Sequence, residues 1–256
     1  IVTLLTPNGP LSLTGDVAIT ADDVVFAANA QIDQSAGSGA VTVTADRSIT
    51  MNAGAAITTA DGAIALTAAG NGSGNFVGID LTDTTITTAD GAISLDGTGS
   101  GVNNNRHGVF LAGTTAIEAT DSGTIDITGQ GGGDRTSNRG ILVEAGSSVE
   151  VVNGDLTMIG TGGPGGDPVP NNNNRGIEVN GRVATSGTGN ISLTGQGGGA
   201  STGDAANNNQ GVDLSGAGAL ITSTGAGNIS VIGIGGGSAA ADGETNEGIR
   251  ITTAGA

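Results

Sequence analysis

The sequence predicts an all-β fold, a parallel β-helix (β-solenoid) with three short strands per coil and about eight coils. Three observations lead to this prediction. An apolar-x-apolar start recurs at intervals of 25 to 37 residues, apolar and polar residues alternate inside each repeat, and turn-forming pairs separate the alternating segments. The first apolar residues of the starts are Val24, Ile49, Ile79, Val109, Ile141, Ile177, Val212 and Ile249.

Each repeat contains a second and a third alternating segment after its start. The second segment centres on one apolar residue, in turn Ile32, Ile57, Ile86, Ile117, Val149, Val183 and Ile221. The third carries an apolar pair, in turn Val41/Val43, Ile64/Leu66, Ile93/Leu95, Ile125/Ile127, Leu156/Met158, Ile191/Leu193 and Ile229/Val231. Period-two alternation with β-branched residues is typical of half-buried strands, and no segment sustains a helical period. We therefore expect like strands of successive coils to pair in parallel, about 4.7–4.9 Å apart, with essentially no helix.

Glycines mark the corners of the predicted coil. Asp61-Gly62 and Asp90-Gly91 precede third strands, and we expect these pairs to adopt the positive φ of a sharp corner. From Gly78 onward a glycine also precedes each first strand, where we expect loop backbone to crowd the coil. The predicted core includes Ile79, Leu81, Ile93, Leu95, Val109, Ile125, Ile177 and Ile191.

The connection from each third strand to the next first strand lengthens along the chain. Ile49 follows Val43 by only 6 positions, whereas Gly176 follows Met158 by 18. These connections are rich in Gly and Asn, and loops at the same corner of successive coils must lie side by side. We interpret residues 1–256 as a single β-helix domain with regular coils from about residue 15, longer loops from about residue 67 onward, and a loop-bearing edge. We also expect it to be a fragment of a longer repeat protein.

Composition excludes several partners. The chain has 24 acidic and 7 basic residues, a formal charge of −17, and this surface repels nucleic-acid phosphates and anionic lipid. We therefore expect no nucleic-acid binding. No apolar run is long enough for a transmembrane helix, so we also expect no membrane insertion. Cysteine is absent, which removes disulfides and thiolate zinc sites. Gly and Asn are abundant, but the regular apolar alternation argues against disorder.

The repeat style resembles a known family. The pattern is Gly-Ile-x-Val/Leu, as at residues 78–81, then x-Ile-x-Thr, then Gly-x-Ile-x-Leu-Thr-Gly, as at residues 189–195. It resembles the filamentous-haemagglutinin-like and autotransporter-passenger-like secreted β-helical proteins of Gram-negative bacteria, over roughly residues 15–256. The resemblance implies a right-handed parallel β-helix that is secreted or displayed on the cell surface. It assigns no functional residue to this chain.

Polar and apolar residues near the loops are the candidates for contact with a partner. The asparagine clusters have two interpretations. Their amides bind glycan hydroxyls, or they form hydrogen-bond ladders between coils. Arg139 and Arg175 also have two interpretations. They bind an anionic ligand, or they form solvent-exposed ion pairs with carboxylates such as Glu144 and Glu178. By alternation Phe110 and Leu142 point out of the coil, where loops cover them or a partner does. The candidate contact residues are Phe110, Leu142, Asn103, Asn138, Asn171, Asn207, Arg139 and Arg175.

No catalytic, cofactor-binding or metal-binding constellation is predicted. His107 is the only histidine, and a lone histidine without cysteine cannot build an ordinary zinc site. Asp80, Glu178 and Asp213 share an outward column, but Phe110 and Leu142 interrupt it, so the column is not a catalytic cleft. We expect no cofactor; calcium stays an open alternative, although the glycine-rich nonapeptide of calcium-binding β-rolls is absent.

Two functions of different classes fit these patterns. The first is an extracellular structural repeat protein that forms a rod or filament segment of a bacterial surface, by self-association or end-to-end continuation of the β-helix. The alternative is an adhesin whose loop edge binds glycans or other cell-surface proteins. A polysaccharide-acting β-helix enzyme is a distant third. The sequence does not identify a ligand, and we do not expect the chain to be an enzyme.

Overall fold

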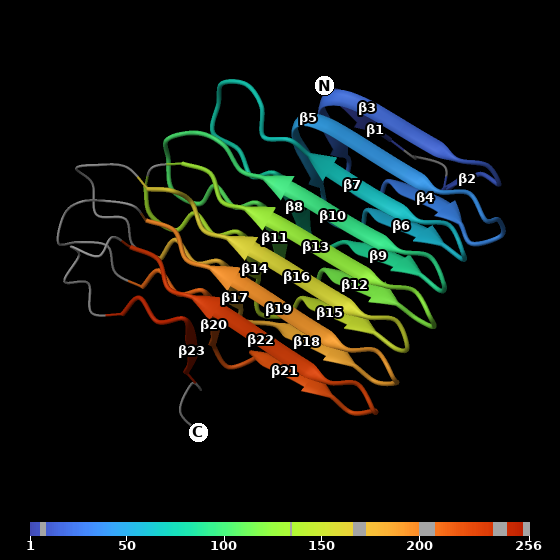
Figure 1. The fold of residues 1–256 in the computed structure, drawn as a ribbon. Coiled ribbons are helices and arrows are strands. Elements are labelled where there is room, and N and C mark those ends of the chain that lie inside the picture. The colour runs from blue at the N-terminus through green and yellow to red at the C-terminus, as the bar shows by residue number, and fades with distance from the viewer. Residues whose placement is uncertain (6–8, 134, 166–172, 200–207, 238–244, 253–256) are drawn as a thin grey trace.

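The computed structural model describes residues 1–5, 9–133, 135–165, 173–199, 208–237 and 245–252. Within these ranges the chain forms a parallel β-solenoid of strands and turns, and no helix occurs. In Figure 1 the strands lie one below the other from the blue N-terminal end to the red C-terminal end, and the longer connections project at the left. Among the described residues no helix is long and apolar enough to cross a membrane.

The strands form three columns, one for each predicted segment of the repeat. Column one contains β1(Val2–Leu4), the end of β3(Val17–Phe26), the end of β5(Val41–Met51), β8(Ile79–Thr82), β11(Val109–Ala112), β14(Ile141–Val143), β17(Ile177–Val179), β20(Val212–Ser215) and β23(Ile249–Thr252). Column two contains β2(Leu11–Ser12), β4(Gln31–Gln34), β6(Ala56–Thr59), β9(Thr85–Thr88), β12(Ala116–Ala119), β15(Ser148–Val151), β18(Arg182–Thr185) and β21(Leu220–Ser223). Column three contains the first parts of β3 and β5, then β7(Ile64–Ala68), β10(Ile93–Thr98), β13(Ile125–Gln130), β16(Leu156–Thr161), β19(Ile191–Gln196) and β22(Ile229–Ile234).

The predicted strand register is confirmed. Up to the last strand of each column, every strand pairs in parallel with the like strand of the next repeat, and Ile79 pairs with both Ile49 and Val109. In column two Ile86 pairs with Ile57 and Ile117 in the same way. Each predicted start therefore lies on the next start along the axis, as expected for stacked coils.

Columns one and three belong to one 15-stranded sheet, whereas column two forms a separate 8-stranded sheet. The reason is local. In β3 and β5 no loop interrupts the chain between the third and first segments, so each strand serves both columns. From β7 onward the inserted loops separate the two columns. The prediction of three separate short strands in every coil is therefore wrong for these first repeats.

The core is a narrow apolar interior with few aromatic residues. All eight predicted core residues are at most 1% exposed. Successive coils place like residues on one another: Ile93 pairs with Ile64 and Ile125, and Leu95 with Leu66 and Ile127. Such stacking fills a core of constant cross-section with aliphatic side chains alone.

The corner glycines are required for a different reason from the predicted one. Gly62 and Gly91 are not among the glycines with positive φ, so that expectation is wrong. A Cβ at Gly91 would instead lie less than 3.0 Å from the carbonyl oxygen of Gly62. At the other corner a Cβ on Gly108 would lie equally close to the backbone of Gln130, which confirms the predicted crowding there. At these glycines the backbone of the neighbouring coil is too close for a Cβ.

Candidate functional site

Four of the candidate residues lie on the outer face of column one, beneath the loops, namely Phe110, Leu142, Arg139 and Arg175. We call this face the covered column. Its outward residues pair in register along the axis, in the order Asp80, Phe110, Leu142, Glu178, Asp213 and Arg250. The residues that directly precede the first-strand glycines lie beside this face, namely Val77, His107, Arg139, Arg175, Gln210 and Glu247.

Phe110 and Leu142 point out of the coil, as the alternation predicts, yet solvent reaches little of them. Leu142 is 5% exposed and Phe110 is partly buried. The ring of His107 lies over Phe110, with the ring centroids 5.2 Å apart and the planes at 46°. The segment before β11 therefore folds back over the outer face of column one, which creates a second, partly polar layer outside the apolar core.

The predicted pairing of the arginines with Glu178 forms, but the pairing with Glu144 and the predicted solvent exposure do not match the structure. Arg139 and Arg175 both bind the carboxylate of Glu178, and Arg175 Nη1 lies 2.5 Å from Glu178 Oε2. The predicted pairing with Glu144 does not form. Arg175 and Glu178 are only 8% and 6% exposed, so the expectation of solvated pairs is wrong. The loops bury both charges, and breaking such a pair leaves an uncompensated buried charge.

Burial and neighbouring charges act in opposite directions on the carboxyl groups of this face. Burial opposes ionisation of Glu178, but the guanidinium groups of Arg139 and Arg175 outweigh it and hold the pKa of Glu178 below its usual range. Burial raises the pKa of Asp80, which accepts one side-chain hydrogen bond, from Thr82. Burial also raises the pKa of Glu144, against the opposing charge of Arg139.

The polar layer continues along the axis through Asp213, which is fully buried. Arg175 Nε lies 3.2 Å from Asp213 Oδ2, and Arg250 donates to both carboxylate oxygens at 2.9 Å. Gln210 accepts a hydrogen bond from Arg175 Nε at 2.9 Å and donates one to Glu247 at 2.9 Å. Charged and amide groups on neighbouring repeats thus bind one another directly.

Besides this polar layer, asparagines in the same loops form a ladder of hydrogen bonds between repeats, which we call the asparagine ladder. The side-chain oxygen of Asn138 accepts the N–H of Arg106 at 2.7 Å, and that of Asn174 accepts the N–H of Asn138 at 2.8 Å. The next steps continue to Asn209 at 2.8 Å and Asn246 at 3.0 Å. Asn138, Asn174 and Asn209 are fully buried. These amides hold successive loops together by hydrogen bonds that run parallel to the strand pairing.

The other predicted asparagines lie elsewhere. Asn103 is exposed, and its backbone N–H donates to Asn75 Oδ1 at 3.2 Å. Asn171 and Asn207 lie outside the described residues. Of the predicted asparagines only Asn138 belongs to the described ladder, whose members lie two positions before a first-strand glycine, as Asn174 lies before Gly176. That fixed offset is the signal that could have identified the ladder.

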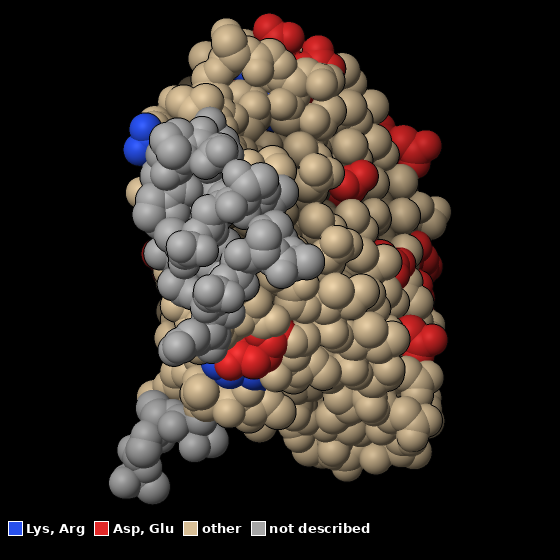
Figure 2. All heavy atoms as spheres, turned by 60° about the vertical axis from the view of Figure 1, so that its left-hand side comes forward, with Lys and Arg blue, Asp and Glu red and all other residues tan. Residues whose placement is uncertain are grey.

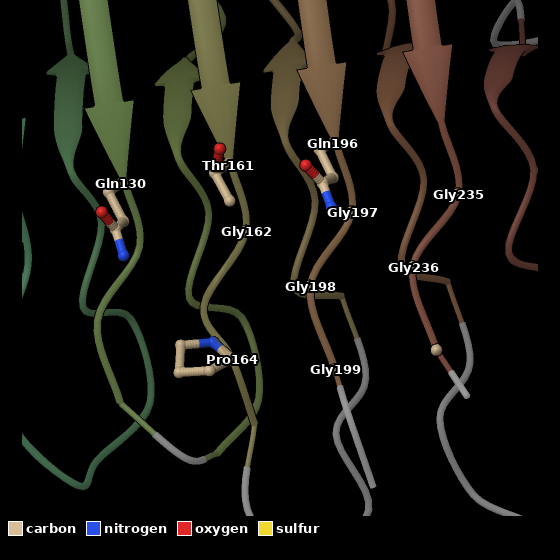
Figure 3. Close-up of a pocket in the computed structure, with 11 residues that line it drawn as sticks. Gln130, Thr161, Gly162, Pro164, Gln196, Gly197, Gly198, Gly199, Gly235 and Gly236 are labelled. Carbon is tan, nitrogen blue, oxygen red and sulfur yellow. The ribbon is translucent and has the colours of Figure 1, made fainter.

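Two hollows flank these loops. The first is a groove of about 300 Å³ at the ends of β13, β16, β19 and β22, shown in Figure 3. Gln130, Thr161 and Gln196 follow one another along its side, and stacked glycines form its floor. The glycines are explained by the close approach of neighbouring loops, since a Cβ at Gly197 would meet the backbone of Asn209.

The second hollow is a cavity of about 320 Å³ on the covered column, which we call the His107 cavity. Its walls include the residues Asp80, His107, Phe110, Arg139, Leu142, Glu144 and Glu178. Within the described ranges no group of three His, Cys, Asp or Glu side chains is arranged to hold a metal ion. The cavity therefore combines carboxylates, an imidazole, a guanidinium group and an aromatic ring without a metal-ligand geometry.

Comparisons with protein-family models, with curated proteins and with solved structures found no match for this chain.

Proposed function

We propose that this chain is an extracellular structural repeat protein, a rod or filament segment of a bacterial surface. In this proposal it is a single right-handed parallel β-helix of about eight coils that is secreted or displayed by a Gram-negative bacterium. It associates with further copies or continues end to end into more β-helix. The fold class supports the proposal because a solenoid extends along one axis by adding coils.

The observation that carries the proposal is that the polar candidate residues bind residues of neighbouring repeats. Asn138, Arg139 and Arg175 point to neighbouring repeats, where they accept or donate hydrogen bonds or form buried ion pairs. Side chains committed to bonds between coils stiffen the stack rather than present a recognition surface. Figure 2 shows acidic side chains spaced down one side of the visible face, which favours solubility of an exposed rod.

Two measurements on the producing cells and the purified chain test this function. Antibodies against the chain are expected to label intact cells without permeabilisation. Light scattering of the purified chain is expected to show particles that lengthen with concentration at constant width. Labelling that requires permeabilised cells, together with particles that stay single and compact at every concentration, would contradict the proposal.

The groove in Figure 3 favours a second candidate function, adhesion through the loop edge. Its exposed amides, Gln130 and Gln196, are spaced along the axis with Thr161 between them, an arrangement suited to hydroxyl groups of a linear glycan. Glycan-array binding that is lost in a Gln130→Ala/Gln196→Ala double variant, and kept in a Thr58→Ala control on β6, would support adhesion. An array without signal would leave the rod as the better account.

A further inference from the structure

The His107 cavity has features that the ladders of the rod do not require. It lies on the outer face of β8, β11, β14 and β17, and its volume of about 320 Å³ falls at the lower end of the range for small-molecule sites. The apolar part of its wall comes from Phe110 and Leu142. The polar part contains both hydrogen-bond donors and hydrogen-bond acceptors that no other described residue binds.

His107 supplies the first free donor. The side chain is 3% exposed, and its Nδ1 accepts the backbone N–H of Arg139 at 3.3 Å. Burial, reinforced by Arg139 and Arg106, lowers the pKa of His107 to about 3, so the ring is neutral at physiological pH. A neutral ring whose Nδ1 is an acceptor carries its proton on Nε2. No described residue accepts a hydrogen bond from that Nε2–H, so this donor is available to a ligand in the cavity that His107 lines.

Arg139 supplies further donor capacity. Its Nε binds Glu178 and its Nη1 donates to the carbonyl oxygen of Ser137 at 3.3 Å. Among the described residues Nη2 has no partner. The guanidinium group is held in place by its two bonds and still presents N–H groups to the cavity.

Two carboxylates supply the acceptors. Glu144 forms no side-chain hydrogen bond or ion pair with the described residues, and Asp80 accepts only the hydroxyl of Thr82, at 3.3 Å. Each also feels the cost of burial without a bound cation. The wall therefore offers acceptors at Asp80 and Glu144 together with donors at His107 and Arg139.

We propose that the His107 cavity binds one neutral pyranose ring of a glycan. Each sugar hydroxyl both donates and accepts, so neighbouring hydroxyls can satisfy the carboxylates and the free N–H groups together. The polarised C–H face of the ring fits the partly exposed ring of Phe110, whose π face is electronegative. An anionic ligand would meet three carboxylates, and a simple cation would leave the His107 and Arg139 donors unpaired.

This inference goes beyond the rod function and does not depend on the groove of Figure 3. The cavity lies beneath the loops on column one, whereas the groove lies at the ends of column three. The rod function neither requires nor excludes a sugar-binding pocket on its side.

The unique histidine gives a direct test. Selective ¹⁵N-histidine labelling of the whole chain yields signals from His107 alone, because no other histidine exists. We expect the free protein to show the Nε2–H tautomer. Millimolar glucose, galactose, mannose or N-acetylglucosamine is then added in turn, and at least one is expected to shift the Nε2 and Hε1 signals saturably. Two charged control ligands are tested in the same way. Lysine carries a net positive charge at neutral pH, and glutamate carries a net negative charge.

Variants separate binding from damage to the fold. Glu144→Gln, whose side chain has no described partner, is expected to weaken sugar binding about tenfold, a loss of about 1.4 kcal/mol. Glu118→Gln, on the outer face of β12, is the matched control and should bind as the wild type does. Saturable shifts with lysine or glutamate but with no sugar would overturn the proposal, and so would equal affinities for the two variants or no response to any sugar.

Discussion

At the scale of single residues, polar side chains near the loops serve mainly to join repeats. Asn174 illustrates this, because it is fully buried, accepts the N–H of Asn138 and donates its own N–H to Asn209. A backbone donor buried inside stacked loops needs such an acceptor, since an unpaired buried N–H is costly. The ladder is therefore a condition for burying the loops.

We predict that Asn174→Ala lowers the free energy of unfolding by about 1–3 kcal/mol, because it leaves the buried N–H of Asn138 without its acceptor. Urea unfolding followed by far-ultraviolet circular dichroism measures this, and it suits a chain without tryptophan or tyrosine. The control is Asn228→Ala at an exposed corner, which should change stability by less than about 0.5 kcal/mol. Equal effects at both positions would show that the ladder adds nothing beyond surface hydrogen bonds.

Glu178 makes stability depend on pH in a defined direction. The charged groups around it are Arg139, Arg175, Glu144 and Arg250. Because its folded-state pKa is lowered, the ion pairs stabilise the fold above the unfolded-state pKa of about 4.3 and are lost as pH falls through the folded pKa. We predict that the stability advantage of the wild type over Glu178→Gln is constant above about pH 5 and shrinks below about pH 4.

The same urea titrations at successive pH values measure this advantage. Glu150→Gln is the control, since Glu150 pairs with Arg182 on a more exposed face of the solenoid. A constant difference between wild type and Glu178→Gln down to pH 3 would contradict the assigned pKa direction.

At the scale of strands and corners, close stacking of the backbone determines which positions must be glycine. Gly123 follows Gly91 at the same corner, and a Cβ there would lie less than 3.0 Å from the Gly91 carbonyl oxygen. This corner does not use positive φ. The constraint therefore acts between repeats, and it is invisible in a single isolated turn.

We predict that Gly123→Ala destabilises the fold by about 1–3 kcal/mol, the usual cost of overpacking, because the neighbouring backbone has to move. Gly15→Ala is the matched control, since no atom lies within 4 Å of its added Cβ and its φ is not positive. Thermal unfolding by circular dichroism compares the two. A similar loss of stability in both variants would contradict the prediction, because the loss would then come from the backbone freedom of glycine and not from close stacking of the coils.

These elements also show what could be predicted from the sequence. The period-two pattern distinguishes inward from outward residues, so the register of all three columns and the core around Ile93 could be predicted in advance. The pattern carries no information on whether a later loop returns over an outward face. The burial of Arg175, Glu178 and Asp213 was missed for that reason, and so was the cavity beside His107.

At the scale of the whole molecule, three kinds of coil-to-coil bonding run along one axis. Parallel strand pairing continues from β1 to β23, the asparagine ladder joins the loops, and the buried ion pairs join the covered column. Bonding that repeats along an axis suits a load-bearing or spacing element more than a mobile enzyme. This is the physical basis for proposing a rod segment of a bacterial surface.

Electron microscopy of the native surface material that contains this chain, located with a specific antibody, tests the rod proposal most directly. The account predicts labelled rods or fibres of constant narrow width, with an axial repeat of about 4.7–4.9 Å from the stacked coils. Labelled particles that are compact and show no axial repeat, or label confined to the cell interior, would contradict it.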